Sequence, residues 1–428
     1  MTTDDSSPLG RLPRPMRRDM PRVLIVGGGI AGASLAYVLA RQPGMSVTLV
    51  ERETQCGAHA TGRSAALYMP SYGPPAIRAL TLASRSFYSN PPVGFADTPL
   101  LTARGALHVA WEQASPLMAD AKADDSLEAI LSNLKALGAQ GESLTAADCL
   151  RRCPVLRAEG LIGGVFEHDA MDMDVHAILH GFLRGARQAG CSVVTGAEVQ
   201  AFDRRRGVWT VHTGAGDFTA DLVVNAAGAW ADEIGALAGA GSIGLQPKRR
   251  SAFTFDPPEG VDCSAWPAVI DAAERFYFKP DAGRLLGSPA NANPAPPHDV
   301  LPEDLDIAEG IWAIEQSTSL VIGRPKSIWA GLRSFVADGE PVCGHDPDVQ
   351  GLFWMAGQGG YGIQSAPGLA YAASCLLLDN ALPPELLAQG LQAEAMCVQR
   401  LRQDRPSGGA DSIQSLATAS LTSRTNPV

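Results

Sequence analysis

Apolar and polar residues along the chain form a pattern that predicts strands, glycine turns and helices. The run Val23–Val26 is rich in β-branched residues, which is typical of a strand buried in a parallel sheet. A glycine-rich turn follows, then a helical pattern over 33–41, and a second apolar run at Val47–Val50. Strand, turn, helix and strand in this order predict a βαβ unit.

The rest of the chain predicts further helices and strands. Helices are expected from Pro74 to Asn90 and over 116–150, 175–189, 305–316 and 366–378. Antiparallel strands are expected within 248–290, and other strands at 105–111, 165–173, 193–194, 209–211, 222–224, 329–335 and 351–356. The alternation of both kinds of element predicts an α/β protein.

The first turn has the spacing of a dinucleotide-binding site. Gly27 permits the tight turn, Gly29 lets a pyrophosphate approach the backbone, and Gly32 lets the helix pack close to the strand. Glu51 follows the second strand, where a carboxylate can accept both ribose hydroxyls and disfavours the 2′-phosphate of NADP. This motif is compatible with both FAD and NAD.

Composition and charge limit the partners. The 428 residues exceed one typical domain, and the net charge of −11 disfavours nucleic acids and anionic membranes. No apolar stretch is long enough to span a bilayer, and residues 1–21 lack the apolar core of a signal peptide. The eight cysteines show no metal-ligand spacing, so we expect reduced thiols, a cytoplasmic location and no metal.

Two segments of small residues are candidates for cofactor contact. The first, 56–68, either lies against a flat cofactor ring or forms a surface loop. The second contains Gly357, Gly359, Gly360 and Gly362 between a strand and a helix. The start of that helix could stabilise negative charge on a reduced flavin, and the alternative is an ordinary flexible loop.

Two arginines are candidate anion binders. Arg333 lies in an otherwise apolar strand, where a cation needs a partner. The partner is either an acidic side chain of the protein or a substrate carboxylate, which a guanidinium can hold through two parallel hydrogen bonds. Arg250 presents the same alternatives. Tyr277 and Tyr72 are either packing aromatics or hydroxyl donors to the same carboxylate.

Together these motifs resemble the D-amino-acid oxidase superfamily of FAD enzymes, nearest to the bacterial D-arginine dehydrogenase type. The resemblance rests on VGGGIAGAS, the Glu51-Arg52 pair, TGRSAA, VVNAAGAW, QPKRRSAF, WAGLRSFVADG and QGGYGIQ, and it extends from about Arg22 to about Leu401. It implies a Rossmann-like FAD-binding domain of the glutathione-reductase type, interleaved with an α+β substrate domain whose antiparallel sheet covers the flavin. Their expected ranges are 22–85, 165–235 and 325–402 for FAD, and 86–164 and 236–324 for substrate, with a disordered extension at 1–21 and a flexible tail at 403–428.

The resemblance also implies site residues. Arg333 and Tyr277 would hold the substrate carboxylate, Arg250 would assist, and Tyr72 would belong to a mobile loop over the site. The residues expected around a non-covalent FAD are Gly27, Gly29, Ile30, Ala31, Gly32, Glu51, Arg52, Ala60, Thr61, Gly62, Arg63, Ser64, Ala65, Ala66, Val199, Ala227, Gly228, Trp230, Gly331, Gly359, Gly360, Tyr361, Gly362 and Ile363. Those expected around the substrate side chain are Leu67, Met69, Ala106 and His108.

The departures from the arginine-specific enzymes bear on the substrate. Ala106 stands where they carry a carboxylate, and Leu67 and Met69 stand where they carry His and Thr. A cationic side chain would therefore lose its buried counter-charge, a deficit of roughly 2–5 kcal/mol. We expect a preference for neutral or hydrophobic D-amino acids. His108 either contacts the substrate side chain or packs in the core.

The reaction that the resemblance implies is oxidative deamination. The α-hydrogen leaves as a hydride to flavin N5, the imino acid hydrolyses to a 2-oxo acid and ammonia, and a quinone or oxygen accepts the electrons. The alternatives are D-arginine dehydrogenase proper, a sarcosine- or glycine-oxidase-like activity, an NAD-dependent dehydrogenase and a non-catalytic flavoprotein subunit. A tRNA-modifying flavoprotein is disfavoured by the acidic net charge.

Overall fold

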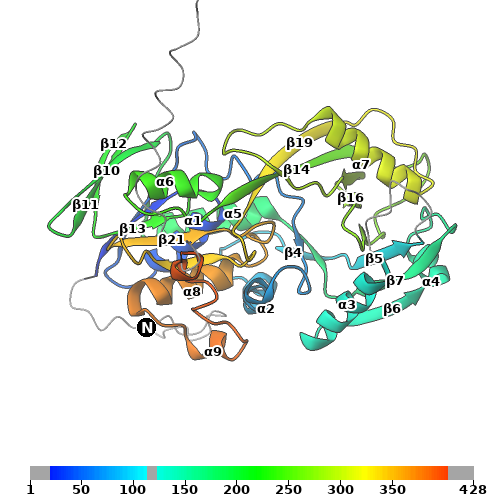
Figure 1. Ribbon diagram of the computed structural model, residues 1–428, viewed down its shortest axis with the longest axis horizontal. Coiled ribbons are helices and arrows are strands. Elements are labelled where there is room, and N and C mark those ends of the chain that lie inside the picture. Colours follow the sequence, from blue (N-terminus) through cyan, green and yellow to red (C-terminus); the bar gives the residue numbers. More distant parts are fainter. Residues whose placement is uncertain (1–19, 113–122, 403–428) are drawn as a thin grey trace, which may run out of the picture.

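The computed structural model describes residues 20–112 and 123–402 (Figure 1). The predicted extension at 1–21 lies almost entirely outside these residues, and the predicted tail at 403–428 lies wholly outside them. Two large sheets organise the described chain. Figure 1 shows them side by side, with the long strands β14 (Gln246–Phe255) and β19 (Ser327–Phe335) running from the region of one toward the other.

The first sheet has six strands and contains the predicted βαβ unit. Its parallel strands are β21 (Leu352–Ala356), β13 (Leu222–Asn225), β1 (Arg22–Val26), β2 (Ser46–Val50) and β9 (Ser192–Val194), and β20 (Val342–His345) pairs antiparallel with β21 at one edge. The unbroken apolar runs reflect burial of both faces, as is usual for parallel strands.

Each face of this sheet has its own core. Val23 and Ile25 of β1 pack under helices, whereas Leu24 and Val26 face the opposite layer. The helices of the first layer are α1 (Ile30–Ala40), α2 (Pro75–Ser89), α5 (Val175–Gln188) and α8 (Ala366–Asp379). The opposite layer contains β10 (Val199–Arg205), β11 (Val208–Thr213), β12 (Gly216–Ala220), the short helix η2 (Gly228–Trp230) and α6 (Ala231–Leu237).

The second sheet has nine strands and is mostly antiparallel. Its order is β18 (Asn293–Pro294), β14, β17 (Arg284–Ser288), β16 (Tyr277–Asp281), β15 (Ala268–Asp271), β5 (Ala106–Trp111), β7 (Leu161–Glu167) and β6 (Gly141–Thr145), with β19 paired to β14. Only the β15–β5 pair among them is parallel in the described chain. Helix α7 (Asp304–Ser317) packs on β14 and β17 through Ile314.

Three smaller groups complete the described chain. Strands β3 (Leu67–Tyr68), β8 (Met171–Met173) and β4 (Leu101–Ala103) form a small antiparallel sheet of three strands. Helices α3 (Ala123–Ala136) and α4 (Ala146–Arg152) flank β6 and β7. The C-terminal part adds α9 (Pro384–Leu387) and η3 (Val398–Leu401).

The predicted elements are largely confirmed, with two corrections. The first helix begins at Ile30, earlier than the expected residue 33, because the last glycine of the turn, Gly32, lies inside it. The continuous helix expected over 116–150 is wrong: the described part holds α3, the strand β6 and α4. β6 is a polar strand whose pairing with β7 supplies its hydrogen bonds, which helical periodicity does not reveal. β19 and the last three residues of β7, 165–167, fall in a different expected domain range from their sheet partners. The domain boundaries stay a prediction.

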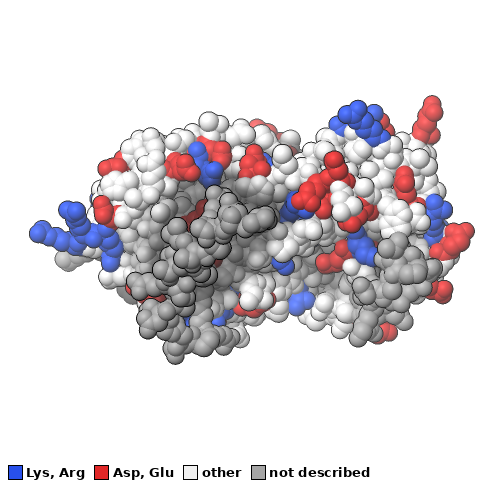
Figure 2. All heavy atoms as spheres, turned by 45° about the horizontal axis from the view of Figure 1, so that its top comes forward, with Lys and Arg blue, Asp and Glu red and all other residues white. Residues whose placement is uncertain are grey.

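No helix among the described residues is both long and apolar enough to cross a membrane. All eight cysteines are unpaired thiols. On the face drawn in Figure 2, basic side chains are interspersed with acidic ones and form no continuous basic surface among the described residues.

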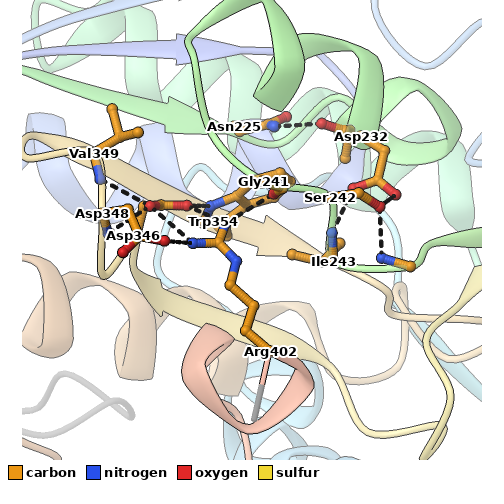
Figure 3. Close-up of polar contacts among 12 residues, drawn as sticks. Asn225, Asp232, Gly241, Ser242, Ile243, Asp346, Asp348, Val349, Trp354 and Arg402 are labelled. Atoms are coloured by element: carbon orange, nitrogen blue, oxygen red, sulfur yellow. Dashed lines mark hydrogen bonds and ion pairs between the residues drawn. The ribbon is translucent and has the colours of Figure 1, made fainter. Parts of the chain in front are cut away.

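A buried charge network ties the end of the described chain to the first sheet (Figure 3). Arg402 donates to Asp346 at 2.7 Å and to the carbonyl of Gly241 at 2.8 Å. The indole of Trp354 donates to Asp346 at 2.9 Å, and the side chain of Asp346 is fully buried. Burial alone would raise the pKa of the Asp346 carboxyl, but the hydrogen bonds from Arg402 and Trp354 hold it below its ordinary value.

We expect Asp346→Asn to lower the free energy of unfolding by about 2–4 kcal/mol at neutral pH, because a buried guanidinium loses its counter-charge. The folded-state pKa of Asp346 is depressed, so its contribution is present above the unfolded-state value of about 4 and is lost as the pH falls through the folded-state value. The difference in the free energy of unfolding between wild type and Asp346→Asn should therefore become smaller in acid. Urea titrations at neutral and acidic pH measure it.

Asp348→Asn is the matched control. This carboxylate also contacts Arg402, at 2.7 Å, but its side chain is 73% exposed. Solvent screening limits the stabilisation from such an exposed ion pair to below about 1 kcal/mol. Equal losses in the two variants would contradict the assignment of the stabilisation to the buried partner.

Candidate active site

The glycine turn between β1 and α1 is packed too closely for larger residues at two of its positions. A side-chain carbon at Gly27 would lie 2.4 Å from the carbonyl oxygen of Ala226, and Gly27 has a φ of +108°. At Gly32 it would lie 2.0 Å from the carbonyl oxygen of Gly27. Gly29 differs: its nearest neighbour would be Thr61 Oγ1 at 3.4 Å. Gly29 is therefore open toward the cavity, as a phosphate-binding position requires.

Glu51 is held directly beside this turn. Its carboxylate accepts hydrogen bonds from the N–H of Gly28 at 2.7 Å and the N–H of Glu53 at 2.9 Å, and the residue is 8% exposed. A carboxylate has about four acceptor positions, so two remain for ribose hydroxyls. Thr61 Oγ1 accepts from the N–H of Ile30 at 3.0 Å and fixes residues 56–68 against the start of α1.

A long cavity extends from this turn toward the second sheet. Most residues expected around FAD line it: Gly27, Gly29, Ile30, Ala31, Glu51, Arg52, Ala60, Thr61, Arg63, Ser64, Ala65, Val199, Ala227, Gly228, Trp230, Gly331, Gly359, Gly360, Gly362 and Ile363. Gly32 and Gly62 lie behind the wall, where side chains would clash with the carbonyl oxygens of Gly27 and Gly57. Ala66 and Tyr361 line a neighbouring cavity instead.

The cavity wall also includes residues that the sequence did not indicate. His59 lies against Trp230, with ring centroids 4.7 Å apart, and Arg52 covers the same indole at 4.6 Å. His298 and Val300 come from the loop before α7. Arg63 anchors this loop by donating to the carbonyl of Val300 at 2.9 Å. The Pro- and Asn-rich composition of 288–300 predicted a loop, but nothing in it indicated this position.

A second cavity adjoins the first where the two sheets meet. The residues that line both are Ser64, Ala65, Arg250, Tyr277, Arg333, Gly360 and Ile363. The structure thus brings Arg333, Arg250 and Tyr277 to the junction, and Tyr72 lines the second cavity. Antiparallel pairing of β14 with β19 places Arg250 opposite Gly331, two residues from Arg333.

Arg333 has no acidic partner within ion-pair distance among the described residues, although it is half-buried. Its guanidinium lies close to the Tyr72 hydroxyl. The glycine loop makes space for it, since a side-chain carbon at Gly360 would lie 2.9 Å from Arg333 Nη1. Within the described residues, therefore, the internal ion pair that was one of the two explanations for this cation is not formed.

Arg250 and Tyr277 lie with Arg333 at the junction of the two cavities, and the two arginines make this corner positively charged. The Nε of Arg250 donates to the carbonyl of Asn291 at 2.6 Å, and no acidic residue in the described chain forms an ion pair with it. Burial and the charge of Arg333 lower the pKa of Arg250. Burial raises the pKa of the Tyr277 phenol, but the charges of Arg333 and Arg250 outweigh it and lower that pKa. An anion at this corner would relieve the repulsion between the two guanidiniums.

Gln364, which lies just before α8, holds the backbone of residues 69–72, called the Tyr72 segment here. The carbonyl of Tyr72 accepts from Gln364 Nε2 at 3.2 Å, and the N–H of Met69 donates to Gln364 Oε1 at 3.1 Å. The ring of Tyr72 also meets the ring of Tyr361 edge-on, with centroids 4.7 Å apart. Gln364, the last residue of QGGYGIQ, thus positions the hydroxyl that Arg333 contacts.

The wall of the second cavity contains three of the four residues expected around a substrate side chain. Leu67, Met69 and His108 line it, whereas Ala106 is fully buried behind Met69. Pairing of β5 with β15, which is distant in sequence, adds Ile270. The other wall residues that the sequence did not indicate include Ser71, Asn133, Glu274 and Phe276.

Comparison with known proteins identifies the family. The model of the FAD dependent oxidoreductase (DAO) family matches residues 22–376. The FAD-dependent oxidoreductase domain-containing protein 1 of Xenopus laevis is 24% identical over 87% of this chain and 81% of its own. The glycine oxidase of Bacillus licheniformis is 24% identical over 85% of this chain and 94% of its own.

Solved structures share the fold. The L-proline dehydrogenase from P. horikoshii superposes with a TM-score of 0.74 at 20% identity, covering 90% of this chain and 98% of its own. The glycine turn, the buried Glu51 and the cavity that joins them suit a bound FAD. The chain therefore belongs to the FAD-dependent oxidoreductase (DAO) family and has its mixed α/β FAD-binding fold.

Proposed function

We propose that this protein catalyses the FAD-dependent oxidative deamination of D-amino acids to 2-oxo acids and ammonia. One observation carries the proposal: Arg333 and Arg250 face the junction of the two cavities and form no ion pair with an acidic residue of the described chain. A substrate carboxylate supplies the missing counter-charge. The glycine oxidase and the L-proline dehydrogenase are named for amino-acid substrates, which supports an amino acid here as well.

Each side chain at the junction has a role in this proposal. Arg333 binds the carboxylate, with Arg250 adding charge, and Tyr277 and Tyr72 donate their hydroxyls to it. This grip fixes the α-carbon at the mouth of the cofactor cavity. Bound FAD supplies the electron acceptor for the oxidation. The amine loses its proton to solvent or to a bound water, and an oxygen molecule or a quinone finally receives the electrons.

The D-configuration and the side-chain preference rest on the sequence resemblance and on the second cavity. Leu67, Met69, Ile270 and Phe276 give this cavity apolar walls, which favour neutral or hydrophobic side chains over that of D-arginine. The unpaired thiols support a reducing compartment such as the cytoplasm. D-Arginine dehydrogenase proper remains the alternative within the same type.

A glycine- or sarcosine-oxidase-like activity is a second candidate, favoured by the glycine oxidase among the relatives. The size of the second cavity argues for a longer side chain than glycine has, because Leu67, Met69 and Ile270 would otherwise enclose empty space.

Anaerobic mixing with single amino acids tests the proposal. We expect neutral D-amino acids to bleach the visible flavin band faster than D-arginine, glycine or sarcosine, because only they combine a carboxylate for the two arginines with an uncharged side chain that contacts the apolar walls. Faster bleaching than by their L-isomers follows from the sequence resemblance. Faster bleaching by L-isomers would refute the stereochemistry, and faster bleaching by sarcosine or glycine would favour the second candidate.

A further inference from the structure

The second cavity has a polar residue that the proposed reaction does not use. It lies at the end away from Tyr277, called the far end here, because it pairs with Ile270, and Ile270 in turn pairs with Tyr277. His108 lines this cavity on β5 and is only 6% exposed. Its Nε2 is fully buried and has no hydrogen-bond partner among the described residues. A buried polar atom without a partner is unfavourable, and most such atoms in proteins are satisfied.

A carboxylate lies directly behind His108. Glu167 of β7 is completely buried, and its Oε2 is 3.7 Å from His108 Nε2, longer than a hydrogen bond. Glu167 also accepts from the N–H of Ser71 at 3.2 Å and from Ser71 Oγ at 2.5 Å. Ser71 itself lines the cavity and precedes Tyr72. One buried carboxylate thus lies against both polar residues at this end of the wall.

The position of Glu167 behind His108 and Ser71 favours an uncharged side chain over a charged one at this end of the second cavity. The Glu167 carboxylate is directed at Ser71 and His108 and is not part of the cavity surface, so the far end offers hydrogen bonds but no free counter-charge. A charged tip buried there would lack a partner of opposite sign. Two other acidic residues line this cavity: Asp271 is buried and forms an ion pair with Arg275 at 2.6 Å, and Glu274 is exposed on the turn before β16.

We propose that His108, positioned by Glu167 and assisted by Ser71, determines specificity by hydrogen-bonding the tip of the substrate side chain. The substrates are then amino acids whose side chain ends in an uncharged polar group, an amide or a hydroxyl. The rest of that side chain contacts the apolar walls of the second cavity. This inference rests on the proposed function and narrows its neutral side chains to the polar ones.

Matched substrate pairs test this proposal: D-glutamine against D-methionine, and D-threonine against D-valine. A site built around a hydrogen bond rejects an analogue that cannot form it, so we expect kcat/KM to favour the polar member of each pair by about tenfold or more. His108→Leu should lower that ratio by about tenfold, mainly through the polar member, and His108→Gln should restore part of it. FAD content and thermal unfolding verify that the variants are folded.

Ile270→Val is the control, because Ile270 is the cross-strand neighbour of His108 and lines the same cavity. It should affect both members of a pair equally. Equal or reversed preference in the wild type overturns the inference, whether or not the His108 variants fold. So does a ratio unchanged in His108→Leu, or a preference for D-lysine over D-norleucine, which would point to Glu274. If no D-amino acid bleaches the flavin, the proposed function itself fails, which is a separate result.

Discussion

Replacement of Arg333 by methionine is expected to lower kcat/KM for D-amino acids by on the order of 10²–10³-fold, mainly through KM. Methionine keeps much of the side-chain length but removes the charge and the two parallel donors. Loss of one partner from a buried, hydrogen-bonded charge pair costs roughly 2–5 kcal/mol, and the expected loss lies within that range. Steady-state kinetics measure the loss, and visible absorbance verifies that the variant still binds FAD.

Lys248→Met is the matched control, because it also replaces a cation by methionine on the strand pair β14–β19. Lys248 is the cross-strand partner of Arg333, but its ammonium lies over the ring of Phe335 and the residue lines neither cavity. The same change of chemistry there should leave kcat/KM nearly unaltered. Normal kinetics in Arg333→Met, or an equal loss in both variants, would remove Arg333 from the substrate site.

Replacement of Gly29 by alanine is expected to weaken FAD binding by about tenfold to a hundredfold while leaving the apoprotein as stable as wild type. The added carbon meets only Thr61 Oγ1, at 3.4 Å, so the protein itself can accept it. It would protrude toward the cavity where a pyrophosphate approaches the backbone, and such overpacking costs roughly 1–3 kcal/mol. Titration of apoprotein with FAD, followed by fluorescence, gives the affinity.

Gly32→Ala separates this effect from damage to the fold. Its added carbon would lie 2.0 Å from the carbonyl oxygen of Gly27, so α1 and β1 must move apart. We expect a loss of at least about 3 kcal/mol in the free energy of unfolding of the apoprotein. If Gly29→Ala destabilised the apoprotein just as much, Gly29 would have a packing role and not a cofactor role.

The cofactor half of the molecule was predictable because its signals are local. The apolar runs of β1 and β2, the glycines between them and Glu51 all lie within thirty residues of one another. At Gly27 and Gly32, close backbone packing also excludes a side chain. The position of Arg333 was predictable for a different reason: a cation in an apolar strand requires a partner, wherever that strand lies.

The second cavity was less predictable because long-range strand pairing assembles it. His108 meets Ile270 only because β5 pairs with β15, and it meets Glu167 only because β5 also pairs with β7. Ser71 and Glu274 come from turns that carry no motif. The prediction of a helix at β6 is wrong for the same reason. Pairing with β7, and not the residues of β6 themselves, determines that β6 is a strand.

The chain passes repeatedly between its two large sheets: β1 and β2 lie in the first, β5 to β7 in the second, β13 in the first, β14 to β19 in the second, and β20 and β21 in the first. No single cut in the chain separates the first sheet from the second, so neither sheet can be exchanged between relatives as one continuous segment. Recombination would therefore be a poor route to a new substrate. Point changes on β5, β15 and the Tyr72 segment alter the second cavity while leaving the glycine turn intact, and directed evolution of this scaffold should begin there.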